Sequence, residues 1–372
     1  MKLKIEKKDL VTLLGRSQNI VEKRANMPVL INVLLESEGN ALRLFATNLE
    51  VSLTGKIPAQ VSNPGKVAVN AKNFFDIVKE LPEGHIELEK KENNWLKITQ
   101  GRAEFNIIGI SPDEYPVFPT FETDDFIQIE SDVFLEMIEK TIYSVATDAA
   151  RYHLNGVFFE KNKSGNEVNY RMVATDGHRL SLVDRQSSTV GKELEGEGVI
   201  IPYKGLNEIR KLIEGTQEDL ELAIEGPQLI VRQGETVLLI RLIEGRYPNY
   251  QQLIPQKLSE TVLLSRESFL SSLKRVSLLS NQKSKGVTLS LSQGRMQITS
   301  NNPELGDARE DIEIDYKGKD MKIAFNARYI LDILGSIHED IVQMQFNDHL
   351  SPGLIRPKED LGYTCIVMPM RI

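Results

Sequence analysis

Apolar residues recur at helical spacing in six segments of the chain, which alternate with shorter runs of strand-like character. In three of the six, the apolar stripe begins at Leu10, Phe134 and Phe269, at intervals of 124 and 135 residues. Apolar residues three and four positions apart line one face of an amphipathic helix. The pattern therefore predicts helices over 6–24, 71–80, 131–145, 203–214, 265–278 and 326–337.

The other three helices each follow a short apolar run, and each carries a basic residue at the equivalent place. These residues are Lys72, Lys204 and Arg328, at intervals of 132 and 124 residues. Two interpretations remain open. The three side chains could be ordinary solubilising charges, or their recurrence could mark a functional face that the copies share.

Strand-like segments repeat with the same period. Thr47, Thr175 and Ser300 each end an apolar alternation, 128 and 125 residues apart, and the Tyr-Pro pairs that begin at Tyr115 and Tyr247 lie 132 apart. Short apolar runs bounded by Gly, Asn, Asp and Pro are typical of antiparallel hairpins. We therefore predict an α+β fold of three homologous domains, each with two helices against antiparallel sheets, over 1–125, 126–256 and 257–372.

Composition and charge narrow the possible functions. The chain has 372 residues, with 45 Lys and Arg against 53 Asp and Glu, and a formal net charge of −8. That balance opposes the simplest nucleic-acid interpretation, in which a binding domain is strongly basic. The six predicted helices, however, contain 15 basic and 12 acidic residues, so they carry +3 and the rest of the chain carries −11. A face shared by the helices would be mildly basic and could hold a polyanion loosely.

Several kinds of site are not expected. The single cysteine, Cys365, excludes an internal disulfide and a multi-cysteine metal site. The five histidines are scattered, so we expect no metal and no cofactor. The charged N-terminal segment lacks the apolar core of a signal peptide, and no apolar run approaches the ~18 residues of a membrane span. We expect a cytoplasmic protein that contacts no membrane.

The run TDGHRL at 175–180 is the segment that most suggests catalysis. Asp176 and His178 could form an acid–base pair. Asp-Gly is also a common turn signal, and the run could belong to a partner-binding groove. The chain contains neither a phosphate-binding loop nor a nucleophile elbow.

The chain ends on the apolar run IVMPMRI. This run could form a final edge strand packed into the third core. Alternatively, Met368, Pro369 and Met370 could wall an apolar groove, a use to which the flexible methionine side chain is suited. Tyr152 and His153 similarly allow either ligand stacking or core packing.

Nine ordered blocks along the whole chain resemble the bacterial DNA polymerase III beta subunit, the family of DNA sliding clamps. The blocks are RANMPVLINVLLE, PGKVAVNAKNFFDIVKELPEG, RYHLNGVFFE, MVATDGHRLSL, EGRYPNYQQLIP, LLSNQKSKGV, SNNPE, FNARYILDIL and VMPMRI. The resemblance implies a non-catalytic processivity factor, a head-to-tail homodimer whose six domains form a ring with helices lining a hole for duplex DNA. Such a ring slides without sequence specificity and is loaded by an ATP-driven partner.

The resemblance also transfers DNA contacts, position by position. They fall on Arg24, Lys72, Asp148, Tyr152 and His153, where Asp148 and His153 replace the usual Gln and Tyr. An acidic side chain does not favour contact with a phosphate. Arg24 follows Lys23, and the default interpretation of the two residues from sequence alone is a solvated charge pair.

A groove for short peptides with Gln and Leu or Phe anchors is implied between the second and third domains. Gln252 and Ser284 stand where a basic and an aromatic residue are usual, so we expect the rim of the groove to differ in shape or partner preference. The groove maps to Leu154, Thr175, Gly177, His178, Arg179, Leu180, Pro248, Leu253, Asn326, Tyr329, Val367, Met368, Pro369, Met370 and Arg371.

Family dimer contacts fall on Phe105 at one face and on Leu278 with Leu279 at the other, while the alternative for these three residues is ordinary core. The implied partners are double-stranded DNA, a second copy of the chain, the replicative polymerase alpha subunit, the clamp loader, repair and translesion polymerases, mismatch-repair proteins and ligase, at the nucleoid. Two alternatives of other classes are an acid–base enzyme at Asp176 and His178, and a monomeric peptide-binding scaffold that never touches DNA.

Overall fold

The computed structural model describes residues 1–21, 27–164, 167–186, 198–216 and 218–371. The chain forms two compact units. Of the described residues, the N-terminal unit holds 1–21, 27–135, 204–216 and 218–242, and the C-terminal unit holds 136–164, 167–186, 198–203 and 243–371. Among the described residues, the unit boundaries therefore fall within helix α3 (Ser131–Glu139), at the start of helix α4 (Tyr203–Ile213) and after Leu242.

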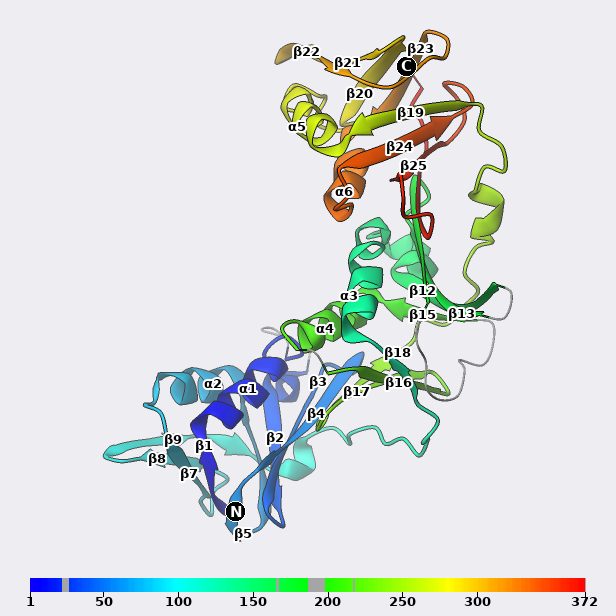
Figure 1. The fold of residues 1–372 in the computed structure, drawn as a ribbon. Coiled ribbons are helices and arrows are strands. Elements are labelled where there is room, and N and C mark those ends of the chain that lie inside the picture. The colour runs from blue at the N-terminus through cyan, green and yellow to red at the C-terminus, as the bar shows by residue number, and fades with distance from the viewer. Residues whose placement is uncertain (22–26, 165–166, 187–197, 217, 372) are drawn as a thin grey trace. The chain divides into compact units, whose positions relative to one another are not determined.

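The N-terminal unit contains two antiparallel sheets, a helix pair and nearly all of helix α4 (Figure 1). Helices α1 (Lys7–Ser17) and α2 (Ala71–Glu80) pack against each other, and α1 touches strands of both sheets. The strands, in sheet order, are β10 (Gly109–Ile110), β6 (Gly65–Asn70), β2 (Asn32–Glu38), β3 (Ala41–Thr47), β4 (Val51–Pro58), β18 (Thr236–Arg241), β17 (Gln228–Gln233), β16 (Leu220–Glu225) and β11 (Ile127–Ile129), and then β5 (Gln60–Asn63), β1 (Lys2–Glu6), β7 (His85–Lys90), β8 (Leu96–Gln100) and β9 (Ala103–Ile107).

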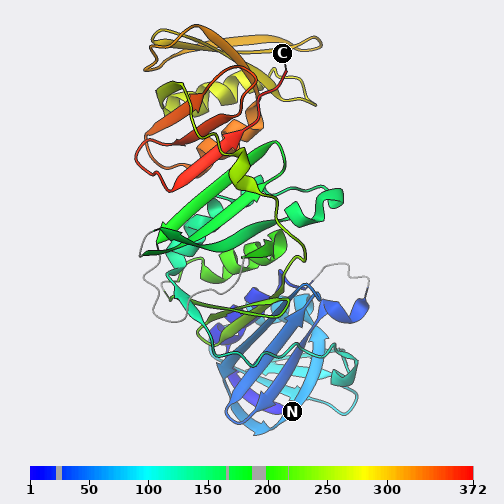
Figure 2. The same cartoon turned by 90° about the vertical axis from the view of Figure 1, so that its right-hand side faces the viewer.

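The C-terminal unit repeats this plan (Figure 2). Helices α5 (Arg266–Ser277) and α6 (Ala327–Ser336) pack together, and α5 again touches strands of both sheets. The strands, in sheet order, are β15 (Val199–Pro202), β12 (Gly156–Ser164), β13 (Glu167–Thr175), β14 (Arg179–Gln186), β26 (Tyr363–Val367), β25 (Gly353–Pro357), β24 (Ile341–Phe346) and β19 (Glu260–Ser265), and then β22 (Gly306–Glu313), β21 (Arg295–Asn302), β20 (Gly286–Ser292) and β23 (Met321–Asn326).

In each unit, one pairing joins strands that are distant in the sequence. We call β4 with β18 the first seam, where Val51 pairs with Ile240. We call β14 with β26 the second seam, where Arg179 pairs with Val367. Each seam joins strands from consecutive predicted domains into one sheet, and this continuity explains why the chain compacts into two units.

The predicted α+β class and the six helices are confirmed, with two corrections at helix ends. The helix predicted over 6–24 ends at Ser17, because Gln18 N–H bonds Gly15 O and the winding tightens; residues 22–24 of that prediction lie outside the described residues. The helix predicted over 131–145 ends at Glu139, after which Thr141 N–H bonds Ile138 O and Ile142–Ser144 form a 3-10 turn.

The structure confirms that the repeated basic residues are equivalent. Lys72, Lys204 and Arg328 each occupy the second position of a helix, in α2, α4 and α6. The side chains of Asn70 and Asn326 cap α2 and α6 by accepting backbone N–H groups. The same local signal therefore starts two of the three helices, because an Asn at this position satisfies an amide that the helix leaves unpaired.

A buried ionic network lies beside the second seam in the C-terminal unit. Lys140 is buried, and its Nζ lies 2.8 Å from Glu136 Oε1 and 2.9 Å from Asp360 Oδ2. Arg185 Nη2 binds the same two carboxylates, each at 2.6 Å. Hydrogen bonds from Arg185 lower the pKa of Glu136, whereas burial alone would raise it. Two cations thus share two carboxylates that come from α3 and from the loop before β26.

We expect this ionic network to make the free energy of unfolding fall as the pH is lowered. The pKa of Glu136 is lower in the folded chain than its ordinary 4.5, so its contribution is present above pH ~4.5 and is lost as the pH falls through the folded value. Glu136→Gln should lower the free energy of unfolding by about 1 kcal/mol at pH 7 and flatten its fall between pH 5 and 3, in urea titrations at a series of pH values. Glu139→Gln, an exposed position of the same helix, should change neither; equal slopes for both variants and the parent would contradict the role of Glu136.

Candidate functional site

The turn between β13 and β14 is the centre of the site. Thr175 Oγ1 donates to Arg179 O at 2.6 Å and accepts from Gly177 N. Asp176 Oδ1 accepts the N–H groups of His178 and Arg179 at 2.9 and 3.0 Å. Gly177 takes a φ of +86°, a conformation that glycine adopts without strain. The Asp-Gly turn is therefore built by side chain to backbone hydrogen bonds, and both Asp176 carboxylate oxygens serve this structure.

Arg179 fastens this turn to helix α6. The side chain is only 8% exposed, and its Nε and Nη1 lie 3.0 Å from Asp176 Oδ2 and 2.5 Å from Asp332 Oδ2. Its Nη2 donates to the carbonyl of Tyr143. The guanidinium also lies over the rings of Tyr143 and Tyr329, 5.3 and 4.6 Å from their centroids. A planar group with several donors in fixed directions can meet all these partners together, which a lysine cannot.

The tail of the chain lies against the same turn. Val367, the last residue of β26, pairs with Arg179, and Met368 N–H bonds His178 O at 2.9 Å. Met370 N–H then bonds Ala324 O on β23 at 2.7 Å. The edge-strand interpretation of the C-terminus is wrong, because β26 lies between β14 and β25 within the eight-stranded sheet. A Met-containing tail is thus held at both ends while Met368 remains 41% exposed.

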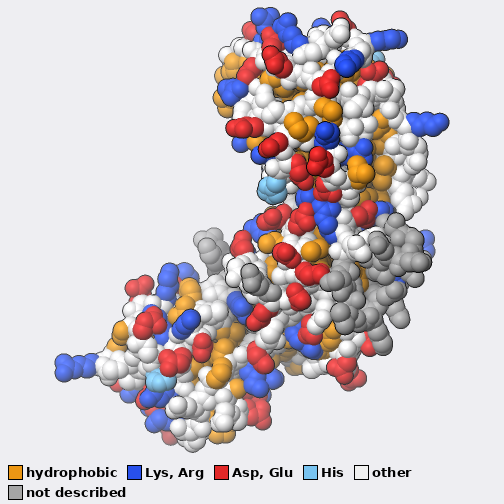
Figure 3. Space-filling model, viewed as in Figure 1, with side chains coloured by type: hydrophobic (Ala, Val, Ile, Leu, Met, Phe, Trp, Pro, Cys, Tyr) orange, Lys and Arg blue, Asp and Glu red, His pale blue; other side chains and the backbone are white. Residues whose placement is uncertain are grey.

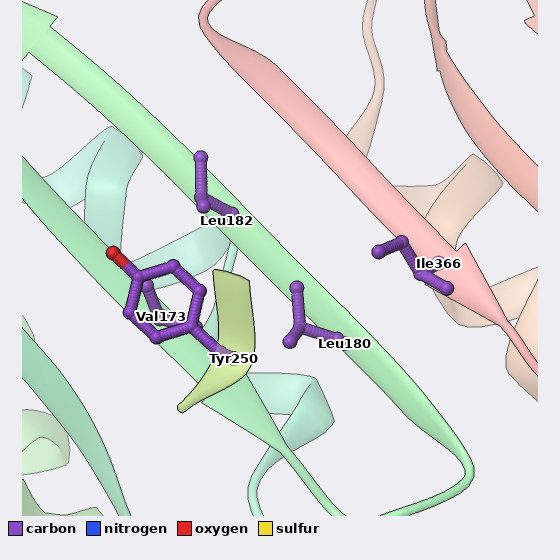
Figure 4. Packing of buried hydrophobic residues seen from close by; sticks show 5 residues of the cluster. All are labelled: Val173, Leu180, Leu182, Tyr250 and Ile366. Atoms are coloured by element: carbon purple, nitrogen blue, oxygen red, sulfur yellow. The ribbon is translucent and has the colours of Figure 1, made fainter. Parts of the chain in front are cut away.

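An apolar cluster supports the seam from one face of the sheet (Figure 4). We call it the Tyr250 cluster. Two polar side chains fix the position of the Tyr250 hydroxyl group: Arg171 Nη1 donates to Tyr250 Oη at 3.0 Å, and the hydroxyl donates to Glu160. Burial raises the pKa of Tyr250. The buried members of the cluster are Val173, Leu180, Leu182, Tyr250 and Ile366.

The structure joins three groups of predicted groove residues directly. The turn at Thr175–Leu180 contacts the tail through the bonds above, and the His178 ring stacks on Tyr329 of α6 at a centroid distance of 6.3 Å. Asn326 caps α6. Some predicted groove residues are buried and can only lie beneath a binding surface: Leu154, Thr175, Leu180 and Val367. Leu253 and Met368 are exposed.

Sequence reasoning missed residues that hold this arrangement in place. Tyr143 and Asp332 bind Arg179, and Tyr250 and Ile366 belong to the apolar cluster. Tyr250 lies within the motif EGRYPNYQQLIP, so its aromatic ring was a usable signal. Asp332 gave no usable sequence signal, because its local sequence does not indicate an ion pair with a residue 153 positions away.

The predicted DNA contacts have different surroundings. Lys72 Nζ binds Asp76 Oδ2 at 2.8 Å, four residues along α2, and both side chains are well exposed. Asp148 caps the short 3-10 helix at Ala149–Leu154 by accepting Ala150 N–H. Tyr152 is 60% exposed, so its core alternative is wrong, and His153 is half-buried. Arg24 lies outside the described residues.

The predicted dimer residues include two clearly exposed apolar side chains. Phe105 is 39% exposed on β9, the last strand of its sheet. Leu278, which follows α5, is 77% exposed, and Leu279 beside it is half-buried. The core alternative is therefore wrong for Phe105 and Leu278.

Surface charge is mixed on both units (Figure 3). Acidic and basic side chains are interspersed on the face shown there, as the near balance of the composition predicts. Among the described residues, no group of three or more His, Cys, Asp or Glu side chains is arranged to hold a metal ion. In that same part of the chain, no helix is both long and apolar enough to cross a membrane.

Repeated α+β elements joined through continuous sheets define the class of sliding clamps. The chain belongs to the DNA polymerase III beta subunit family, whose N-terminal, central and C-terminal domain models match residues 1–119, 128–249 and 251–371. It is similar to the beta sliding clamps of Caulobacter vibrioides and Escherichia coli, with 33% and 30% identity over the full length of both chains.

Solved structures agree with this family. The DNA polymerase sliding clamps from Caulobacter crescentus and Pseudomonas aeruginosa match the whole of each chain, with TM-scores of 0.94 and 0.92 and identities of 33% and 30%. A dimeric ring is known for the family. The chain is therefore a non-catalytic processivity subunit of DNA polymerase III, whose partners are DNA and a polymerase. The acid–base alternative for Asp176 and His178 is wrong.

We predict that the Arg179 contacts cannot be replaced by a simple positive charge. Arg179→Lys should lower the free energy of unfolding by about 2 kcal/mol, because one ammonium cannot bind Asp176, Asp332 and the Tyr143 carbonyl together. Urea unfolding followed by circular dichroism measures the loss. Arg102→Lys, at an exposed turn residue, is the control and should be neutral. Equal unfolding midpoints for the two variants would show that Arg179 acts only through its charge.

Proposed function

We propose that two copies of this chain close head to tail into a ring around duplex DNA, with Phe105 of one copy facing Leu278 and Leu279 of the other. The observation that carries this proposal is the pair of end strands, β9 in one unit and β22 in the other. An exposed sheet edge is a template for pairing with another chain. A head-to-tail interface between two different edges produces a ring when the rotation that relates the copies returns to the first copy. The exposed Phe105 and Leu278 supply apolar area beside those edges.

Within the ring, we propose three domains per chain, over 1–125, 126–256 and 257–372, with their helices facing the DNA. The six α-helices of the described residues contain 12 Lys and Arg against 9 Asp and Glu, whereas the whole chain has a net charge of −8. A weakly basic lining attracts phosphates without holding them tightly, and phosphate contacts carry no sequence information. Both properties suit a ring that slides.

The individual DNA contacts that we propose are Lys72, Tyr152 and His153, together with Arg24. The exposure of Lys72 and Tyr152 supports them. Asp148 is better explained as the cap of its 3-10 helix, since its carboxylate accepts Ala150 N–H at 2.9 Å and lies 3.6 Å from Arg151 Nε.

At the second seam, we propose a groove that binds the short peptides of replication and repair proteins. The turn at Thr175–Leu180, Tyr329 and the tail at Met368–Met370 are joined by direct contacts, and Met368 and Leu253 offer exposed apolar side chains. The proposed partners, at the nucleoid in the cytoplasm, are the polymerase alpha subunit, the clamp loader, repair and translesion polymerases, mismatch-repair proteins and ligase. Gln252 is exposed at this surface and Ser284 Oγ accepts Gly286 N–H, so the rim is polar at both places.

Topological binding predicts an unusual salt response. The protein, loaded on nicked circular DNA by a clamp loader with ATP, should stay bound through a high-salt wash, because encirclement needs no ionic contact. It should leave when the DNA is then cut to a linear form, as gel filtration of labelled protein would show. Retention on linear DNA, or complete loss from the circle in salt, would contradict the ring and favour a monomeric scaffold.

The matched variants for that experiment are Leu278→Asp and Leu361→Asp. Both positions are well exposed, at 77% and 69%, so neither change should unfold the chain. A charge at Leu278 should weaken the proposed interface and abolish salt-resistant retention, while the Leu361 variant should behave as the parent does.

The groove is tested by removing the tail. Deletion of residues 368–372 should reduce the affinity for a labelled polymerase peptide with Gln, Leu and Phe anchors by at least tenfold, measured by fluorescence anisotropy. The dimer should persist in sedimentation, because the proposed interface residues lie elsewhere. Unchanged peptide affinity in the deleted chain would exclude the tail from the site.

A further inference from the structure

The first seam repeats the turn of the second seam, bond for bond. Leu49 N donates to Thr47 Oγ1 at 3.0 Å, as Gly177 N does to Thr175 Oγ1 at 3.1 Å. Asn48 Oδ1 accepts the two backbone N–H groups of residues 50 and 51 at 3.0 and 2.8 Å. Asp176 Oδ1 makes the same two bonds in the other turn.

The strands that flank the two turns also correspond. At the first seam, Ser52 pairs with Leu239 of β18, and at the second seam Leu180 pairs with Ile366 of β26. Ser52 and Leu180 occupy the same register beside their turns, opposite Thr47 and Thr175. The first seam is thus the structural counterpart of the place where we propose a peptide groove.

A cavity of about 290 Å³ lies at this first-seam turn. Its apolar lining includes Leu49, Val117, Pro119 and Leu239. Val117 is 94% exposed and Leu49 is 54% exposed, so two aliphatic side chains meet solvent at its mouth. Exposed aliphatic groups that border a cavity, rather than lying singly on a surface, indicate a binding site.

Leu49 is held in a strained conformation at the mouth. Its φ is +73°, in the left-handed region that leucine rarely adopts, where the corresponding residue of the second seam is a glycine. Strain of this kind persists where the surroundings enforce it and is concentrated at functional sites. The bonds from Asn48 and Thr47 enforce it here, and the result is an aliphatic side chain presented at the cavity.

We propose that the first-seam cavity is a second peptide site, which takes one aliphatic side chain of an extended, uncharged peptide segment. The proposal rests on the peptide site proposed at the second seam. The charged lining consists of Glu50, which pairs with Lys204 at 2.8 Å, and Arg241, so the cavity has no excess of one sign to attract a polyanion. Its volume lies at the lower limit of ligand pockets, which suits a single anchor rather than a folded partner.

The number of peptides bound per chain tests this inference. The probe is a fluorescent pentapeptide with Gln, Leu and Phe anchors, titrated to saturation against the full-length chain in equilibrium dialysis. We expect two bound peptides per chain, of different affinity. Val117→Asp should remove one bound peptide, because it places a charge at the mouth of the cavity. Val117 is exposed, so this change should not unfold the chain.

Two further variants separate this site from the groove. Leu49→Asn should also remove one peptide while leaving the chain folded, since Asn tolerates a positive φ better than leucine does. Leu361→Asn, which is also at a well-exposed position but lies outside the cavity, should leave both peptides bound. A photoreactive leucine in the probe should crosslink to the segment around Val117 in the chain that lacks residues 368–372.

Each stoichiometry decides between the two proposals. One peptide per chain that is lost on deletion of the tail overturns the first-seam site and keeps the groove. Two peptides in the parent, one after tail deletion and none after Val117→Asp is added, support both. Binding that survives the deletion and Val117→Asp alike contradicts both sites.

Discussion

Backbone pairing across the two seams is the constraint on which the rest of the structure depends. Sheet edges carry unpaired N–H and C=O groups, and a repeated α+β domain exposes such edges at each end. At the first seam β4 takes β18 as its neighbour, and at the second β14 takes β26. The pairing converts edges into sheet interiors, and β9 and β22 are among the strands that remain at the ends of their sheets. In the proposed ring, pairing between two copies would cover further sheet edges in the same way.

The seams also determine where function can reside. A tight turn precedes both β4 and β14, and in each turn an Asx side chain accepts two backbone N–H groups. The residues that end each turn therefore lie beside the neighbouring strand of the seam. At the second seam these are His178 and Met368, which share a backbone hydrogen bond. The peptide surface that we propose is thus a consequence of how the sheets are joined.

The sequence predicted the repeat well and the seams poorly, for physical reasons. Helical spacing and the recurrence of Lys72, Lys204 and Arg328 are local signals, and they placed all six predicted helix starts within one residue of the observed ones. The position of β26 inside a sheet is a long-range property, because a terminal apolar run has the same local pattern at an edge or in the interior. The ion pair between Arg179 and Asp332 was similarly invisible, since it depends on a pairing between separate repeats.

Divergence between the two seams shows which features the backbone requires and which it leaves free. The hydrogen bonds of the turn are the same at both, so Thr47 and Asn48 are structurally equivalent to Thr175 and Asp176. The residue that follows is Leu49 in one turn and Gly177 in the other, although both take a positive φ. A glycine costs nothing there, whereas leucine is strained. A leucine at this position presents an aliphatic side chain to the cavity that it borders, which the glycine of the other turn cannot do.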